Sequence, residues 1–237
     1  MYYLIQKIIH RLNLYTYTKF KNRVLNVTKD YENLISDGYY SQEGQDNYIF
    51  NLLNKKFGYF IDIGATDGIH INNSYYFEKN GWDGITIEPN PDYFKKLQKN
   101  RSCQCINACV GTKSTNELFL QVQGYAENYS GLLESYNLAH LKKIHYYNHK
   151  YDGSIKYVEL PVINLMDILD RDKYDVLFID TEGSEYNILS TINFKDININ
   201  IICLENFYND IRIYKLLKKN KYRLIARTIH DEIYSKL

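Results

Sequence analysis

From residue 58 onward, short β-rich runs alternate with stretches of helical character, and this alternation limits the fold more than any other feature. Strands separated by helices favour a parallel sheet with helices on both faces. A closing hairpin, residues 222–228 and 232–235, would add an antiparallel edge. The sequence therefore predicts an α/β fold, with strands at 59–63, 84–88, 104–110, 176–180 and 200–205 and helices near 71–80, 90–99, 184–191 and 209–219.

Composition excludes several classes of protein. The formal charge of +1 disfavours a dedicated nucleic-acid binder, because phosphate contacts need a basic excess. With 45% hydrophobic residues, the chain can bury the core of one globular domain. Four cysteines are too few for a disulfide scaffold, so we expect reduced thiols. No apolar run reaches the roughly 18 residues of a membrane span, and Gln6 and Lys7 interrupt any signal peptide, so we expect a cytoplasmic protein.

The N-terminal part differs from the rest. Residues 2–12 carry apolar side chains at helical spacing, which predicts an amphipathic helix docked on the body or on a partner chain; peripheral membrane contact is the alternative. Residues 13–40 show no clear period and are interpreted as a connector. We expect an N-terminal helical extension (1–40) and one domain (41–237). Both a monomer and a homo-oligomer are compatible with the sequence.

Glycines are concentrated before the second predicted strand. FIDIGATDG, residues 60–68, places Gly64 and Gly68 between a strand and a helix, where bare backbone allows a sharp turn and the approach of a ligand. Glu88 ends the next strand, where an acid can accept hydrogen bonds from ribose hydroxyls. The pattern lacks both G-x-G-x-x-G and a phosphate loop. A nucleoside without a pyrophosphate, such as S-adenosylmethionine, suits it better than a dinucleotide.

Acidic residues follow two further strands. Asp180 and Glu182 come after residues 176–179, and Glu205 ends the next apolar strand. Ligands of open α/β sheets bind at the carboxyl ends of strands. A carboxylate with a raised pKa could take a proton from an acceptor hydroxyl, so Asp180, then Glu182, with Glu205 beside them, are the candidate catalytic residues. Alternatively, Asp180, Glu205 and Asn206 hold Mg²⁺ or Mn²⁺. Glu182 and Glu185 could instead be ordinary helix N-terminal acids.

The order of several segments resembles the FkbM-type S-adenosylmethionine-dependent methyltransferases. The segments are SQEGQD (41–46), FIDIGATDG (60–68), NNSYYFEKNGWDGITIEPNP (72–91), SGL (130–132), FIDTEGSEYNIL (178–189) and LEN (204–206). The resemblance implies a class I, Rossmann-like three-layer fold whose seven-stranded, mostly parallel sheet has an antiparallel terminal strand. It also implies O-methylation of a sugar hydroxyl in a glycan or glycosylated metabolite. Ser184 stands where many members have histidine.

The resemblance also assigns cofactor residues. Asp62, Gly64, Ala65 and Gly68 would surround the methionine end of S-adenosylmethionine, with Glu88 on the ribose. Separately, if the strands at 60–63 and 176–179 flank the ligand crevice, Asp180 faces the methyl group of the cofactor. SQEGQD looks like a lid that closes Ser41, Gln42 and Asp46 over the cofactor, although a helix cap by Ser41 is the structural alternative. The competing functions are a nucleotide-binding module that docks on a glycosyltransferase or membrane, a dinucleotide oxidoreductase, and an RNA methyltransferase.

Residues 112–160 have the weakest secondary-structure pattern in the chain, and we expect acceptor selection there. Strands are predicted at 117–122 and 156–163. Between them, His145 and His149 share a face if the segment is helical, and an isolated pair of this kind is more often a solvated face than a metal site. Nearby tyrosines (146, 147 and 151) could stack on a sugar ring, but with 25 tyrosines in the chain such clustering is expected by chance.

Overall fold

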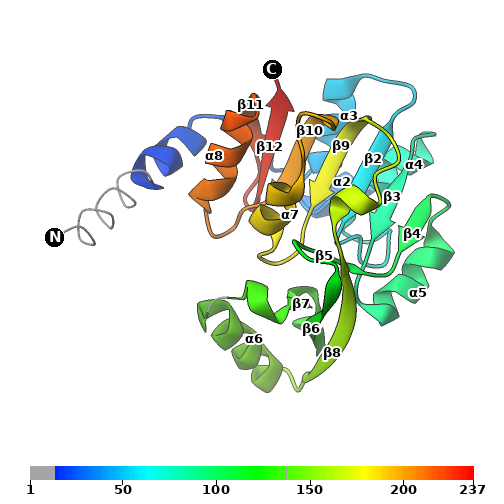
Figure 1. Cartoon of the computed structure of the whole chain (residues 1–237), viewed down its shortest axis with the longest axis vertical. Helices are drawn as coiled ribbons and strands as arrows, with labels where there is room; N and C mark the ends of the chain where they lie inside the picture. The colour runs from blue at the N-terminus through cyan, green and yellow to red at the C-terminus, as the bar shows by residue number, and fades with distance from the viewer. Residues whose placement is uncertain (1–13, 137) are drawn as a thin grey trace.

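A computed structural model describes residues 14–136 and 138–237. Its main sheet has eight strands in the order β1-β11-β12-β10-β9-β2-β3-β4 (Figure 1). Neighbouring strands are parallel, except that β12 is antiparallel to both β10 and β11. The strands are β1 Leu25–Asn26, β2 Tyr59–Ile63, β3 Asp83–Ile87, β4 Gln104–Ile106, β9 Lys173–Ile179, β10 Asn198–Glu205, β11 Tyr222–Arg227 and β12 Asp231–Lys236. The mostly parallel α/β sheet is confirmed, but the two-residue β1 makes eight strands where seven were expected.

Alternate side chains of β2 explain why helices cover both faces of the sheet. Phe60 packs with Ile49 of α3 and Phe77 of α4, whereas Ile61 belongs to the opposite core, which includes Ile188 of α7. Successive side chains of a strand point to opposite faces, so each apolar strand serves two cores. The helices flanking this sheet are α2 Tyr31–Ser36, α3 Gln45–Leu53, α4 Tyr75–Lys79, α5 Pro91–Asn100, α7 Glu185–Thr191 and α8 Ile211–Lys219.

Strand order reverses between β2 and β9. From β2 the chain moves outward through β3 to β4, and from β9 it moves the other way to β10. β2 and β9 are paired in parallel, with Ile63 opposite Ile179. Their carboxyl ends therefore open side by side at a topological switch point, where ligands of such sheets bind.

Residues 109–163 build a separate lobe, in green shades in the lower part of Figure 1. Its four-stranded sheet has the order β5-β8-β6-β7. The predicted single strand at 104–110 is wrong. Residues 107–108 are not in a strand, and they separate β4 from β5, which belong to different sheets. The lobe contains β5 Cys109–Val110, β6 Thr115–Gln123, η1 Glu127–Tyr129, β7 Gly131–Leu132, η2 Leu133–Ser135, α6 Leu138–Lys150 and β8 Ser154–Ile163, and η3 Leu165–Asp167 follows it.

The segment interpreted as a connector has regular structure. Residues 14–21 are helical, and β1 and α2 follow. Tyr17 is buried and donates a hydrogen bond to Glu232 of β12, and Lys21 forms an ion pair with Glu232 at 3.1 Å. The predicted amphipathic helix at 2–12 lies outside the described residues. None of the helices within 14–136 and 138–237 is long and apolar enough to cross a membrane.

Candidate active site

A cavity of about 450 Å³ opens at the carboxyl ends of β2 and β9. Residues from the main sheet and from the lobe line it together. Seven of the predicted site residues border this cavity: Gln42, Asp62, Gly64, Glu88, Asp180, Glu182 and Glu205. Segments that are far apart in the sequence therefore meet around one space.

The turn after β2 requires glycine at position 64. Gly64 has φ +91°, and a Cβ built there would lie 1.8 Å from the carbonyl oxygen of Asp180. The amide of Asp180 in turn donates to the carbonyl of Ile63 at 2.9 Å. Gly64 thus allows the ends of β2 and β9 to approach each other closely, so the turn and the acidic loop form neighbouring parts of the same cavity lining.

Glu88 joins the glycine turn to the start of α5. Its carboxylate accepts hydrogen bonds from the amides of Thr66 and Asn90, both at 2.8 Å. Burial raises the pKa of Glu88 to about 7, although these two bonds favour its ionised form. Each carboxylate oxygen can accept a second hydrogen bond, so a ligand hydroxyl in the cavity can still reach Glu88.

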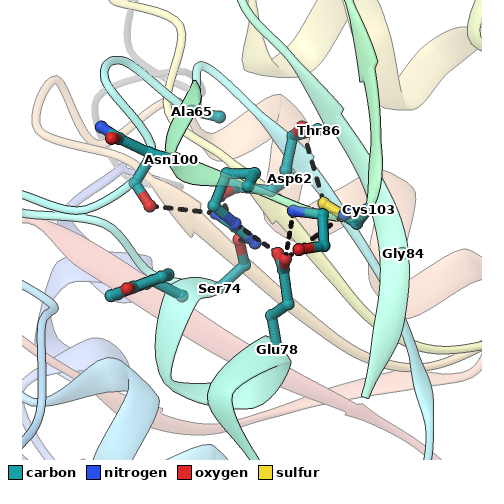
Figure 2. Close-up of polar contacts among 12 residues, drawn as sticks. Asp62, Ala65, Ser74, Glu78, Gly84, Thr86, Asn100 and Cys103 are labelled. Carbon is teal, nitrogen blue, oxygen red and sulfur yellow. Dashed lines mark hydrogen bonds and ion pairs between the residues drawn. The ribbon is translucent and has the colours of Figure 1, made fainter. Parts of the chain in front are cut away.

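Asp62 rests on a buried polar network that the sequence did not reveal. Its Oδ2 accepts hydrogen bonds from the Asn72 side-chain amide at 3.0 Å and from the Ser74 hydroxyl at 2.6 Å. Arg101 donates to Ser74 Oγ at 3.0 Å and forms an ion pair with Glu78 of α4 (Figure 2). The residues NNSY, noted above only as part of a motif, therefore fix the acid at the floor of the cavity.

Three carboxylates converge in the same cavity, beside the Gly64 turn. An oxygen of each of Asp180, Glu182 and Glu205 lies within 4.8 Å of the others. Asp180 is open to the cavity, whereas Glu182 and Glu205 are half-buried. Burial and repulsion by Glu185 raise the pKa of Glu182 to about 8, whereas burial and repulsion by Asp180 and Glu182 raise that of Glu205 to about 11. The surrounding protein and then Glu182 also raise the pKa of Asp180. Such a group gains stability by binding a proton or a divalent cation.

Glu185 lies in the first turn of α7, as the alternative interpretation of a helix N-terminal acid predicted. Its Oε1 accepts hydrogen bonds from the amides of Thr181 and Gly183, at 3.1 and 3.0 Å. It is buried and stabilises the loop that carries Glu182. Glu182 itself has φ +56° and faces the cavity, so the loop holds one acid for structure and presents the other.

Asn206 is not placed as a metal ligand. Its amide donates to Tyr17 Oη at 3.0 Å and to Glu232 at 3.1 Å, and its Oδ1 accepts from the Asp210 amide at 2.7 Å. All of its polar atoms are therefore used inside the protein. Glu182, rather than Asn206, completes the oxygen group with Asp180 and Glu205.

Ser41 and Asp46 are also placed away from the cavity lining. Both are fully buried, and the Ser41 hydroxyl donates to Asp46 Oδ1 at 2.5 Å. Asp46 additionally accepts from the amide of Tyr40 at 2.7 Å. The N-cap of α3 is Gly44 and makes no side-chain cap hydrogen bond, so Ser41 does not form the helix cap that was the alternative to a lid. Only Gln42 of the motif borders the cavity.

Ala65 and Gly68 support the turn from behind. Ala65 is fully buried. A Cβ on Gly68 would lie 2.6 Å from the Leu97 side chain of α5, so Gly68 lets the turn pack against that helix. Neither residue is part of the cavity lining.

One histidine of the lobe reaches the acidic group. His140 of α6 is buried, and its Nε2 lies 3.5 Å from Glu182 Oε2. Burial and the nearby Lys143 lower the pKa of His140 to about 4, so its ring is neutral at pH 7. His145 and His149, which the sequence placed on a shared helical face, are both exposed on α6. The helical spacing in the sequence drew attention to the exposed pair His145 and His149. The contact between His140 and Glu182 becomes visible only in the folded chain.

Comparison with protein-family models matched residues 62–224 to the Methyltransferase FkbM domain. The chain belongs to the FkbM methyltransferase family. This family consists of S-adenosylmethionine-dependent methyltransferases. The matched range contains the glycine turn, Glu88, the three carboxylates and the whole lobe of this FkbM protein, whereas SQEGQD precedes it.

Solved structures and curated proteins were also compared. A TehB-like S-adenosylmethionine-dependent methyltransferase from Corynebacterium glutamicum is 9% identical, with a TM-score of 0.42 over 87% of this chain and 94% of that chain. Magnesium protoporphyrin IX methyltransferase from Synechocystis is 9% identical, with a TM-score of 0.39 over 81% of this chain and 76% of that chain. No curated protein matches the sequence. The family assignment therefore depends on the domain match alone.

Proposed function

We propose that this protein transfers the methyl group of S-adenosylmethionine to a carbohydrate hydroxyl. The observation that carries the proposal is that one cavity is lined both by Gly64 and Glu88, residues suited to a nucleoside, and by a group of carboxylates with raised pKa values. Donor and acceptor must meet in one space for methyl transfer, and this cavity offers each of them suitable partners.

The donor would lie across β2 and β3. Glu88 would accept hydrogen bonds from the ribose hydroxyls, and Asp62 would stand near the methionine amine. Val110, Phe119 and Leu132 line the cavity as an apolar wall suited to the flat adenine ring. These assignments agree with a nucleoside that lacks a pyrophosphate.

The acceptor would lie at the three carboxylates. Bound S-adenosylmethionine supplies a methyl group on a sulfonium, which departs as a neutral thioether when the methyl carbon bonds to the hydroxyl oxygen. Asp180 would take the hydroxyl proton, with Glu182 beside it as the second candidate and Glu205 holding the sugar. A general base of this kind accelerates transfer by about 10²–10⁴-fold.

A divalent cation fits the same residues. Asp180, Glu182 and Glu205 offer three oxygen ligands within 4.8 Å of one another, the donor type that Mg²⁺ and Mn²⁺ prefer. The ion would make the sugar hydroxyl more acidic. Transfer in the presence of a chelator distinguishes the two schemes, since an unchanged rate excludes the cation.

The deciding experiment is calorimetric titration with S-adenosylhomocysteine, followed by mass-spectrometric screening of sugar acceptors. We expect binding by the wild-type protein and at least about tenfold weaker binding by Glu88→Ala. Glu159→Ala is a matched control, because Glu159 is exposed and not part of the cavity lining. Absence of binding by the wild-type protein contradicts the proposal. Binding without transfer to any acceptor would favour the nucleotide-binding module.

A further inference from the structure

Five tyrosines of the lobe form a connected group outside the cavity. Tyr147 is at the centre, and the ring centroids of the other four lie between 5.4 and 6.2 Å from its own. The outermost pair, Tyr125 and Tyr151, is stacked at 4.0 Å. We call this group the tyrosine surface: Tyr125, Tyr129, Tyr146, Tyr147 and Tyr151.

Much of this surface is open to solvent. The exposed fractions of Tyr125, Tyr146 and Tyr151 are 66%, 59% and 42%. Aromatic rings stabilise a protein mainly when they are buried, and these three gain little in that way. A contiguous exposed aromatic group is typical of a binding surface.

The tyrosine surface adjoins the rim of the cavity. Tyr129 lies between Asn128 and Ser130, both of which line the cavity. The Lys143 ammonium lies 4.5 Å from the ring centroid of Tyr129 and 5.2 Å from that of Phe207. Phe207 follows Glu205 of the acidic group by two positions. A molecule that leaves the acidic end of the cavity can therefore continue onto the tyrosines.

The chemistry of the surface suits a sugar chain. A pyranose has flat C–H faces that pack on aromatic rings, and hydroxyls that bond with phenols and ammonium groups. Lys150 supplies a second cation, 5.0 Å from the ring centroid of Tyr151. Residues 125–157 contain four lysines and three acids, which gives no basic excess for a nucleic-acid backbone.

The size of the cavity points the same way. At about 450 Å³ it lies towards the small end of the range of roughly 300–1,000 Å³ for ligand sites. With a nucleoside in place, it leaves room for little more than the sugar that is methylated. Any further sugars of the acceptor must lie outside, and the tyrosine surface begins at that opening.

We propose that the tyrosine surface binds the sugars adjoining the methylated one, so that the acceptor is an oligosaccharide or polysaccharide rather than a free monosaccharide. This inference rests on the proposed function, because it takes the cavity as the site of sugar methylation. It adds a second contact area that selects chains over single sugars.

Binding can be tested without turnover. Saturation-transfer NMR and calorimetry would be run on the full chain with cellohexaose, mannohexaose and galactohexaose, and with the three monosaccharides. We expect at least one hexaose to bind more tightly than its monosaccharide, and the double variant Tyr125→Ala/Tyr151→Ala to weaken that binding by about tenfold or more. Tyr15→Ala is the matched control, since Tyr15 is also 66% exposed but belongs to the N-terminal helical residues.

Circular dichroism and binding of S-adenosylhomocysteine, both unchanged, would show that the double variant is folded. If it is not folded, the single variant Tyr125→Ser replaces it. The inference is overturned if no hexaose binds, or if the variants bind all of them as the wild-type protein does. It is also overturned if the substitutions abolish binding of oligouridylate or dissociate a dimer instead. Because these readouts need no methyl transfer, a failure of the proposed function, seen as absent S-adenosylhomocysteine binding, is a separate result.

Discussion

At the scale of single residues, the site depends on close approaches that leave no room for side chains. At Gly64 both the positive φ and the carbonyl oxygen of Asp180 exclude a Cβ. Gly38 has a similar φ of +84° but nothing within 4 Å of a Cβ. The two glycines therefore separate the cost of backbone conformation from the cost of a clash.

We predict that Gly64→Ala lowers the free energy of unfolding by about 3 kcal/mol or more, whereas Gly38→Ala lowers it by about 1–2 kcal/mol. Urea denaturation of both variants measures the difference. Equal effects would mean that the ends of β2 and β9 separate at no cost, which would contradict their close contact at Gly64 and Asp180.

A second prediction concerns Asp180. Asp180→Asn keeps the shape of the side chain but cannot accept the acceptor proton. We expect its transfer rate to fall by about 10²-fold or more, with the affinity for S-adenosylhomocysteine within about threefold of wild type. Single-turnover kinetics and calorimetry measure the two quantities. A wild-type rate would remove Asp180 from the mechanism and direct attention to Glu182.

At the scale of elements, α4 is joined to the C-terminal end of α5 by a buried ion pair. The Arg101 side chain is fully buried, and its carboxylate partner Glu78 is only 14% exposed. Arg101 also donates to Asn72 and Ser74, which hold Asp62. The position of α4 and the geometry of the cavity floor are therefore coupled.

We predict that Glu78→Gln destabilises the fold by about 3 kcal/mol, because it leaves a buried guanidinium without its counter-charge. Weaker S-adenosylhomocysteine binding should accompany this loss. Lys95→Ala, which removes an exposed ion pair with Asp92 at 3.8 Å, is expected to change stability by less than about 0.5 kcal/mol. Unfolding curves and titrations of both variants test the coupling, and intact binding in Glu78→Gln would contradict it.

The sequence predicted elements well where local pattern determines them. β2 was predicted to the residue, and Glu88 and Asp180 fall beside the ends of their strands as expected. Errors occurred where distant contacts decide. The helical residues 14–21 depend on Tyr17 meeting Glu232, more than two hundred residues away. Likewise, only the packing of α6 brings His140 to Glu182. Ser41 and Asp46 are a local case: they were assigned to a ligand, but they bond to each other five positions apart.

At the scale of the whole molecule, the fold opposes ionisation of several carboxyl groups in the site. Glu88, Glu182 and Glu205 have pKa values raised to about 7, 8 and 11, so the folded state holds protons that the unfolded chain releases near pH 4.5. A raised carboxyl pKa gives stability at low pH that is lost as pH rises through the folded value. His140, lowered to about 4, has the opposite effect only below about pH 6.5.

We predict that the unfolding temperature of the ligand-free protein falls between about pH 6.5 and 8.5, and that Glu182→Gln makes this decline shallower. Calorimetric scans across this range measure both slopes. An unfolding temperature that rises with pH would show that the acids are ionised in the folded state. Adding Mg²⁺ at the higher pH should restore stability if the carboxylates bind the ion.

The two ends of the lobe lie side by side, although the chain leaves the main sheet after β4 and returns to it at β9. β5 and β8 pair there in parallel, with Cys109 opposite Val162 and Val110 opposite Ile163. Because these two residue pairs hold β5 beside β8, residues 109–163 form an insertion whose ends are neighbours. Exchanging this insertion between relatives would therefore change the proposed acceptor surface and, through Val110, Phe119 and Leu132, the proposed adenine wall at the same time, and one pair of neighbouring junctions would suffice for the exchange.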